Sequence, residues 1–514
     1  MEGSFFVARR IGLVFLPIIA LISCISLSAQ EFRATLTGTV TDPSGAAVPN
    51  ATVEAVNRDT QQRYSATTTG KGDYYIPYVL PGTYRVTVTS PGFQTNVQDN
   101  ITLNAAQSRG VNFKLVVGSQ TQTVEVNAAP PLLENATGSG GSILTQRQLE
   151  NLPLNGRQVY TLLGTTPGSQ FAQTQFGATG YSGTRGWDVS NNYTLGGGVQ
   201  NYQQFTLNGT NITEQTGGGA GTWFIAPNVD ALQEVNVMTT TYDARYSRTG
   251  GGTVNMVVKS GSNNFHGNVY EYFNNGHLNA NNFQSNVAGI AKPMVHENQF
   301  GGTFGGPIKK DKIFFFGSFE GYRESIPFTV TSSTVPGYLR PTADGVNFNN
   351  TAQSGVTYQI YDPLTTTCIN GAGAIAGSLG NCSSPNHYAR QLFPNNTIPT
   401  SRINPAGAAL LNLYPSPNTA GAALSNNFVA NAPDVYDYNQ PMARVDYDTS
   451  DKTRWYSLFA FQHGTEDRNT NGFTGVAERC NCAHTRQNLT ASQDMTHIFS
   501  PTLVADFKLS FVRF

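Results

Sequence analysis

The sequence predicts a mostly β protein: a small β-sandwich, a mixed α and β middle part, and a C-terminal antiparallel sheet that spans a membrane. Three observations predict this class. Charged residues are 12% of the 514 residues, about half of the roughly 25% usual in soluble domains. The 23 Tyr and 30 Phe suit strand surfaces. Short runs of alternating polarity recur between turn residues. The net charge of −1 leaves no basic footprint, so we expect no nucleic-acid partner.

The N-terminus carries an export signal. Arg9 and Arg10 precede an apolar run over residues 11–27, and small residues follow it. This order is typical of a secretory signal peptide, predicted here at residues 1–29. A membrane anchor is the alternative, but the run is short for a spanning helix and contains Pro17. Later stretches are too polar for a spanning helix, so residence in a membrane would have to be through β-strands.

Residues 30–117 hold six or seven short alternating runs separated by turns, as in a small β-sandwich. The region also carries a set of spaced glycines, prolines and strand residues: Gly38-x-Val40-x-Asp42, Pro49-x-Ala51-x-Val53, Gly72-x-Tyr74 and Leu80-Pro81-Gly82-x-Tyr84. This pattern resembles the carboxypeptidase regulatory-like domain, which has a carbohydrate-binding-like fold. The resemblance implies an accessory domain without a catalytic zinc, and sugar binding by analogy of fold only.

Residues 143–260 mix one helical signal with strands. Ser142 or Thr145 would cap a helix through Leu149, before Pro153 ends it. Two motifs stand out, Pro-Leu-Asn-Gly-Arg at 153–157 and Gly-Gly-x-Val-Asn-x-Val-x-Lys-Ser-Gly at 251–261. They resemble the plug domain of TonB-dependent outer-membrane receptors, in the Oar-like branch where a regulatory-like domain precedes the plug. The resemblance implies an α+β plug inside a wide barrel.

Residues 118–142 form a Gly- and Pro-containing linker around one short alternating segment, Thr123-Val124-Glu125-Val126. An extended segment with flexible flanks can add a strand to the sheet edge of a partner. The receptor resemblance makes these four residues the candidate TonB box, the segment that an inner-membrane complex grips. A last strand of the sandwich is the alternative, and the residues alone do not decide between the two.

Residues 261–514 are predicted to be the N-terminal part of an outer-membrane β-barrel, because long and short connections alternate between strand-like runs. On one run Leu489, Ala491 and Met495 alternate with polar residues, as a lipid-facing and a lumenal side require. A soluble sandwich is disfavoured by the very long connection at 324–437. The seven predicted runs are 265–273, 298–305, 312–323, 438–447, 453–462, 486–497 and 502–514, and the aromatics assigned to interfacial girdles are Tyr270, Tyr272, Tyr322, Tyr447, Trp455 and Phe511.

The number of strands predicts an incomplete receptor. Plugged outer-membrane transporters have about 22 strands, and single-chain bacterial barrels use even numbers. Seven runs are too few and odd, so we expect the reading frame to continue beyond Phe514.

Four cysteines lie in predicted extracellular loops. Cys368 and Cys382 share one loop, and we expect them to form a disulfide in the oxidising compartment that an exported chain enters. Cys480 and Cys482 share another loop and are too close for an unstrained bond, so their redox state is left open.

The motifs of common hydrolases, metalloproteases and nucleotide-binding loops are missing from the sequence, so we expect neither enzyme activity nor a cofactor or metal site. The resemblance implies an outer-membrane receptor and transporter of a scarce solute. Its implied partners are a TonB-type inner-membrane energy-coupling complex, outer-membrane lipid and an extracellular ligand that could be an oligosaccharide, a peptide or a metal chelate. The competing hypothesis is an outer-membrane-anchored adhesion or carbohydrate-binding surface protein.

Overall fold

A computed structural model gives the fold. It describes residues 31–119, 123–127, 140–152, 157–171, 193–199, 202–213, 225–240, 246, 250–281, 283, 286, 292, 294–353, 356–370, 374–376, 388–419, 424–468, 471–477, 483–500 and 503–514. The signal peptide predicted at 1–29 lies outside them. No helix in this described part combines the length and the apolar character needed to cross a bilayer.

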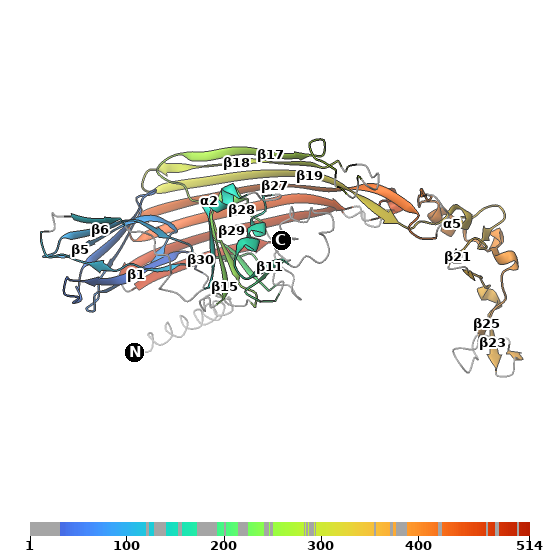
Figure 1. Cartoon of the computed structure of the whole chain (residues 1–514), viewed down its shortest axis with the longest axis horizontal. Coiled ribbons are helices and arrows are strands. Elements are labelled where there is room, and N and C mark those ends of the chain that lie inside the picture. The colour runs from blue at the N-terminus through green and yellow to red at the C-terminus, as the bar shows by residue number, and fades with distance from the viewer. Residues whose placement is uncertain are drawn as a thin grey trace, which may run out of the picture.

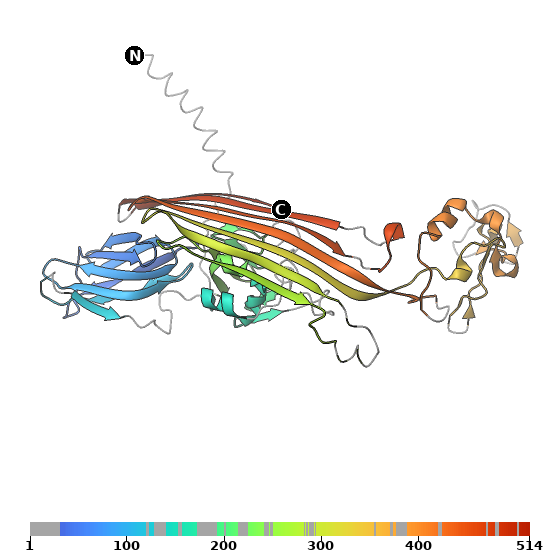
Figure 2. The same cartoon turned by 90° about the horizontal axis from the view of Figure 1, so that it is seen from above.

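The parts of the chain are arranged along one long curved sheet (Figure 1). The N-terminal sandwich and the central unit, residues 140–260, lie on the same face of this sheet, the sandwich near one end (Figure 2). Beyond the other end lies the long connection at 333–427.

The sandwich consists of two sheets around a closed apolar core. One has the order β4-β1-β7, with β8 also on β1, and the other the order β3-β2-β5-β6-β9. Leu36, Tyr84 and Phe113 are each at most 1% exposed between them. Two of these strands, β3 and β7, were not predicted from the sequence. The bounds are β1 Ala34–Thr41, β2 Thr52–Asn57, β3 Arg63–Thr67, β4 Asp73–Val79, β5 Gly82–Thr89, β6 Thr95–Leu103, β7 Ser108–Gly110, β8 Phe113–Lys114 and β9 Thr123–Asn127.

In its described residues the central unit has a mixed sheet of order β10-β15-β16-β13-β14, a separate pair β11-β12, one short α-helix and two 3-10 helices, labelled η. Of the two predicted caps Thr145 is the right one, and its backbone N–H donates to the Gln148 side chain at 2.9 Å. Leu149 of the helix is buried, as expected for its apolar position. The bounds are β10 Gly140–Thr145, α2 Gln146–Asn151, η2 Val159–Thr165, β11 Ser169–Phe171, β12 Tyr193–Leu195, β13 Gln204–Leu207, β14 Thr210–Asn211, η3 Val229–Ala231, β15 Leu232–Thr240 and β16 Thr253–Val258.

The long sheet, here called the wall, is antiparallel with the order β17-β18-β19-β27-β28-β29-β30. Its seven strands match the seven predicted runs and are mostly longer. The predicted alternation is confirmed, because connections 310–312, 451–452 and 501–502 lie at one end and 276–295, 333–427 and 469–482 at the other. The bounds are β17 His266–Asn275, β18 His296–Lys309, β19 Ile313–Ser332, β27 Phe428–Ser450, β28 Thr453–Arg468, β29 Ala483–Ser500 and β30 Leu503–Arg513.

The two faces of the wall differ as period-2 alternation requires. On the inner face, which is the face toward the central unit, β29 places buried polar residues such as Thr490 and Asp494. On the outer face, β30 places Phe507, Leu509 and Phe511, which are all more than half exposed. The predicted division of β29 is therefore confirmed.

Three girdle predictions are wrong, because Tyr270, Tyr272 and Tyr322 point to the inner face. The Tyr322 hydroxyl donates to Glu324 at 2.6 Å, and that of Tyr270 donates to Glu320 at 2.9 Å. A buried tyrosine hydroxyl needs a hydrogen-bond partner, and the carboxylates of the inner face supply one, whereas the hydrocarbon of a membrane does not. The other predicted aromatics, Tyr447, Trp455 and Phe511, are exposed on the outer face.

The described residues of the connection at 333–427 form small hairpins, short 3-10 helices and an α-helix whose N-cap Asn404 accepts the N–H of Ala406 at 2.9 Å. Its elements are η4 Gly337–Leu339, β20 Val346–Asn347, β21 Ala352–Gln353, β22 Val356–Thr357, η5 Pro363–Thr365, β23 Thr367–Asn370, β24 Ala374–Ala376, β25 Tyr388–Ala389, η6 Pro394–Asn396, β26 Thr397–Ile398, η7 Thr400–Arg402 and α5 Pro405–Leu411; η8 Gly475–Ala477 lies between β28 and β29.

Candidate functional site

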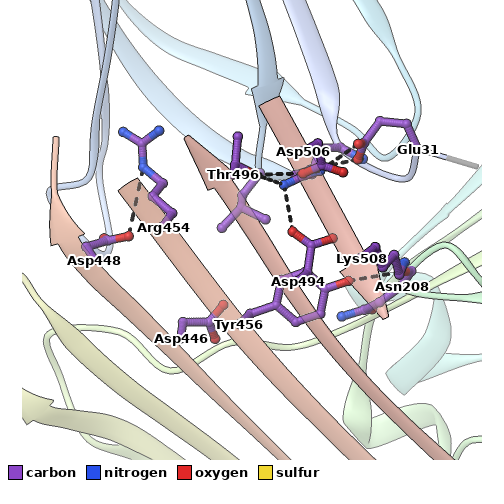
Figure 3. Close-up of polar contacts among 12 residues, drawn as sticks. Glu31, Asn208, Asp446, Asp448, Arg454, Tyr456, Asp494, Thr496, Asp506 and Lys508 are labelled. Carbon is purple, nitrogen blue, oxygen red and sulfur yellow. Dashed lines mark hydrogen bonds and ion pairs between the residues drawn. The ribbon is translucent and has the colours of Figure 1, made fainter. Parts of the chain in front are cut away.

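The candidate site is the polar contact zone where the sandwich and the central unit meet the inner face of the wall. Its most connected residue is Arg33, at the start of the sandwich. The guanidinium lies 2.6 Å from Asp506 and 3.2 Å from Asp494, both on the wall, and also donates to Thr496. Asp494, Thr496 and Asp506 lie close together on neighbouring strands (Figure 3). Arg33 is only 6% exposed, so these are contacts of a desolvated charge.

Glu31, two residues before Arg33 in the chain, also binds the Arg33 guanidinium. Its carboxylate accepts from Arg33 Nε at 2.7 Å and from Nη2 at 2.6 Å. Burial would raise the pKa of Glu31, but the charge and hydrogen bonds of Arg33 outweigh burial and leave the pKa below its usual value. The carboxylate therefore stays ionised at neutral pH and helps to neutralise the buried arginine.

A second group joins the central unit to the same strands. Tyr456 on β28 donates to the backbone oxygen of Asn208 at 3.1 Å, and Lys508 on β30 donates to the same oxygen (Figure 3). Phe32 packs edge-on against Tyr456, with ring centroids 5.8 Å apart. One backbone carbonyl of the central unit thus receives two donors from the wall.

A third group holds the last strand of the central unit. Arg444 on β27 donates to the backbone oxygen of Val258 at 2.6 Å and is paired with Asp446 at 2.7 Å. Asp446 in turn accepts from the Ser260 hydroxyl at 2.7 Å. Arg444 is 2% exposed, and Phe316 and Leu458, which are also buried, pack in the same apolar cluster as the central unit. The contact zone therefore combines an apolar patch with buried ionic groups.

The predicted motif residue Arg157 lies at the other side of the zone. It pairs with Asp230, which also accepts from Asn268 on β17 at 3.0 Å. Its guanidinium lies over the rings of Tyr272 and Tyr270, at 4.3 Å and 5.2 Å from the centroids. The rest of that motif, residues 153–156, lies outside the described residues.

The sandwich is also tied to the central unit. Glu234 on β15 accepts the backbone N–H of Ala105, and Asn236 donates to the oxygen of the same residue at 2.6 Å. Burial raises the pKa of Glu234 to about 7, although its hydrogen bond from Ala105 acts in the opposite direction. This carboxyl group therefore changes charge near neutral pH.

A cavity of about 600 Å³ lies where the three parts meet. Asn57 and Pro81 line it from the sandwich, Glu150 and Lys259 from the central unit, and Tyr272 from β17. Lys259 and Glu150 are paired at 2.7 Å, and Asp59 and Asp230 add two further carboxylates to the lining. The contact zone thus encloses polar space between the sandwich, the central unit and the wall.

The candidate TonB box forms strand β9 of the sandwich. Its residues pair in parallel with β6, from Thr95 opposite Thr123 to Gln98 opposite Val126. For the predicted disulfide, Cys368 lies on β23, while Cys382 lies outside the described residues, as do Cys480 and Cys482. Within the described part, acidic residues, His and Cys form no group suited to a metal ion.

Sequence reasoning missed Arg33, Arg444 and Glu234. Each is a charged residue buried against an element distant in the chain, and Arg33 contacts residues more than 460 positions away. The available signal was a charged residue in phase with the other polar residues of an alternating run, as at Lys508 between Asp506 and Ser510.

Together these features define a class of protein: a wall of long antiparallel strands with an apolar outer face, whose polar inner face is packed against a folded unit. The chain belongs to the outer membrane beta barrel domain family, whose model matches residues 257–514. Membership places it in the outer membrane of a Gram-negative-type bacterium. The carboxypeptidase regulatory-like domain matches residues 35–116, as its motifs suggested.

The TonB-dependent transporter Oar of Myxococcus xanthus is 27% identical over 300 residues. The match covers 55% of this chain and 26% of that protein. The outer-membrane transporter YddB of Escherichia coli is similar at 13% identity and a TM-score of 0.39, over 70% of this chain and 37% of that one. A mutant ferric enterobactin receptor (PfeA) of Pseudomonas aeruginosa is similar at 12% identity and a TM-score of 0.39, over 73% and 40%.

Proposed function

We propose that this chain acts as an outer-membrane transporter that takes up a scarce solute with TonB-type energy coupling, and that residues 143–260 are its plug. The observation that carries the proposal is the way the central unit is held on the inner face. Groups from β17, β27, β28 and β30 hold it, through Asn268, Gln440, Arg444, Tyr456 and Lys508. A unit held against a lumenal face would obstruct passage and would have to move for a solute to pass.

Movement of such a unit requires work, because several of its contacts are buried ionic groups whose separation is costly. The outer membrane holds no energy source of its own, so the work has to arrive from the inner membrane through an N-terminal segment. Thr123–Val126 is our candidate for that segment. It is part of β9, the last strand of the sandwich before the central unit in the chain, so a pull on it would act on the sandwich and on the chain that leads to the start of the plug at β10.

The relatives support the transport class, while the solute is inferred from chemistry alone. The resemblance to a TonB-dependent transporter supports coupled uptake. An oligosaccharide, a peptide or a metal chelate would each suit an inner face lined by tyrosines, carboxylates and amides, such as Tyr322, Glu297 and Gln299.

The test is uptake of labelled oligosaccharides, peptides and ferric chelates by cells carrying Val124→Pro or the matched control Val124→Ala. Proline cannot donate to an added strand, whereas alanine keeps the backbone donor. We expect Val124→Pro to abolish uptake with surface binding intact, and Val124→Ala to retain both. Normal uptake by Val124→Pro would remove the segment from the mechanism. Surface binding without any coupling-dependent uptake would favour the adhesion hypothesis.

A further inference from the structure

Strand β9 lies at the edge of its sheet in the sandwich, and a role for this edge in energy coupling rests on the proposed function. β9 is the last strand of the sheet β3-β2-β5-β6-β9, so in the described part of the chain only one of its edges is paired. The sheet behind it is well anchored, because β2, β5 and β6 bury Val53, Val86 and Ile101 in the sandwich core. The candidate box is therefore held extended by a stable sheet.

Among the residues that the structure describes, no strand pairs with the second edge of β9, so this edge can accept a strand from another chain. An edge strand presents a row of unpaired N–H and C=O groups, which is a template for strand addition. β9 lies at the side of the sandwich that faces away from the wall (Figure 2). The sandwich itself lies near the short connections 451–452 and 501–502, since Arg454 and Asp506 beside them contact it. Short connections are periplasmic in outer-membrane barrels.

We propose that the regulatory-like sandwich is the docking platform for the energy-coupling partner, which adds an extended strand to the free edge of β9 while β9 stays paired with β6. The alternative order of events, in which the partner strips β9 from β6, requires five residue pairs to break before any pair forms. Addition at the free edge breaks none. The partner strand would also pair with a strand that is already ordered. The conformational entropy lost on ordering the backbone of β9 is therefore part of the folding of the sandwich and does not weaken binding.

The platform gives the sandwich a mechanical role. A force that pulls on the partner strand would act on β6 and the rest of its sheet, and not only on the linker. The sandwich passes that load to the wall through Arg33 and to the central unit through Ala105, which Glu234 and Asn236 hold. The sandwich would thus take part in every coupling event.

The experiment fixes β9 to β6 covalently and measures partner binding. Thr95 and Thr123 are register partners, so Thr95→Cys with Thr123→Cys should form a disulfide across the two strands. The full-length chain in detergent is titrated with the purified periplasmic domain of a TonB-type protein from the same bacterium. The oxidised and the reduced double variant are compared with each single variant.

We expect the oxidised and reduced forms to bind with dissociation constants within twofold of each other. A loss of tenfold or more on oxidation, restored by reductant, would mean that β9 has to leave β6 and would overturn the proposal. Failure of the disulfide to form would overturn the pairing on which it rests. If the unsubstituted chain fails to bind at all, the inference fails together with the coupling function, and the Val124 uptake assay then shows whether transport itself survives.

Discussion

Glu234 should make the contact between the sandwich and the central unit sensitive to pH. Burial raises the pKa of this group from 4.5 to about 7, so the docked state binds more protons than the separated state between these values. The contact is therefore strongest below pH 4.5 and weakens as the pH rises through about 7. At about 1.4 kcal/mol per pKa unit, the free energy of this contact falls by about 3 kcal/mol in total as the pH rises from below 4.5 to above about 7.

Hydrogen–deuterium exchange of the segment around Ala105 measures this loss in the full-length chain. After correction for intrinsic exchange rates, protection of this segment should fall by one to two orders of magnitude between pH 5 and pH 8, since about 1.4 kcal/mol corresponds to a factor of ten. Glu234→Gln should abolish the pH dependence and should exceed the wild type in protection at pH 8, because a neutral amide oxygen still accepts the Ala105 N–H.

The matched control is Gln233→Ala on the same strand. Gln233 donates to the backbone oxygen of Pro81 at 3.1 Å, so its loss should weaken the same interface and leave the pH slope unchanged. Protection that is flat with pH in the wild type, or a slope that persists in Glu234→Gln, would refute the assignment of the titration to this residue.

Three further outcomes are expected. Arg33→Met should raise exchange of residues at the start of β1 by the equivalent of about 3–5 kcal/mol, because it leaves buried carboxylates unpaired; Arg63→Met, which removes an exposed pair with Glu54, should cost under about 1 kcal/mol in the same assay. Leu509→Arg should lower the heat-modifiable fraction in outer membranes, since arginine on a lipid face costs about 2–4 kcal/mol. Maleimide should label neither Cys368 nor Cys382 on intact cells until reductant is added; labelling of both without reductant would exclude the disulfide.

The wall could be predicted from sequence because its signals are local. Alternation over one strand fixes which residues share a face, as at Leu489 and Thr490, and connection length fixes which strand ends meet. The helix cap at Thr145 is local in the same sense. These features need no knowledge of distant partners.

The contact zone could not be predicted, because it is made of pairings between distant residues. A tyrosine suits an interface with lipid headgroups and a contact with Glu324 equally well. The residue type of Tyr322 therefore led to the prediction of a girdle position, whereas the side chain lies on the inner face. The parallel pairing of Thr123 with Thr95 left no trace in either segment, since an alternating run suits a sandwich edge and a foreign sheet equally. Strand β3 was missed because Arg63–Thr67 is mostly polar, with only Tyr64 and Ala66 facing the core.

The strict alternation of the wall also determines where the gene can tolerate insertions and deletions. Removal of one codon within β29 would shift every following side chain to the opposite face, placing Asp494 in hydrocarbon and Met495 against the sandwich. The short connections 451–452 and 501–502 are constrained for the same reason. Changes in length should therefore accumulate in the connections 276–295, 333–427 and 469–482, which lie together at one end. Related genes would then diverge in length at the end that meets the environment, while the end that meets the sandwich keeps its dimensions.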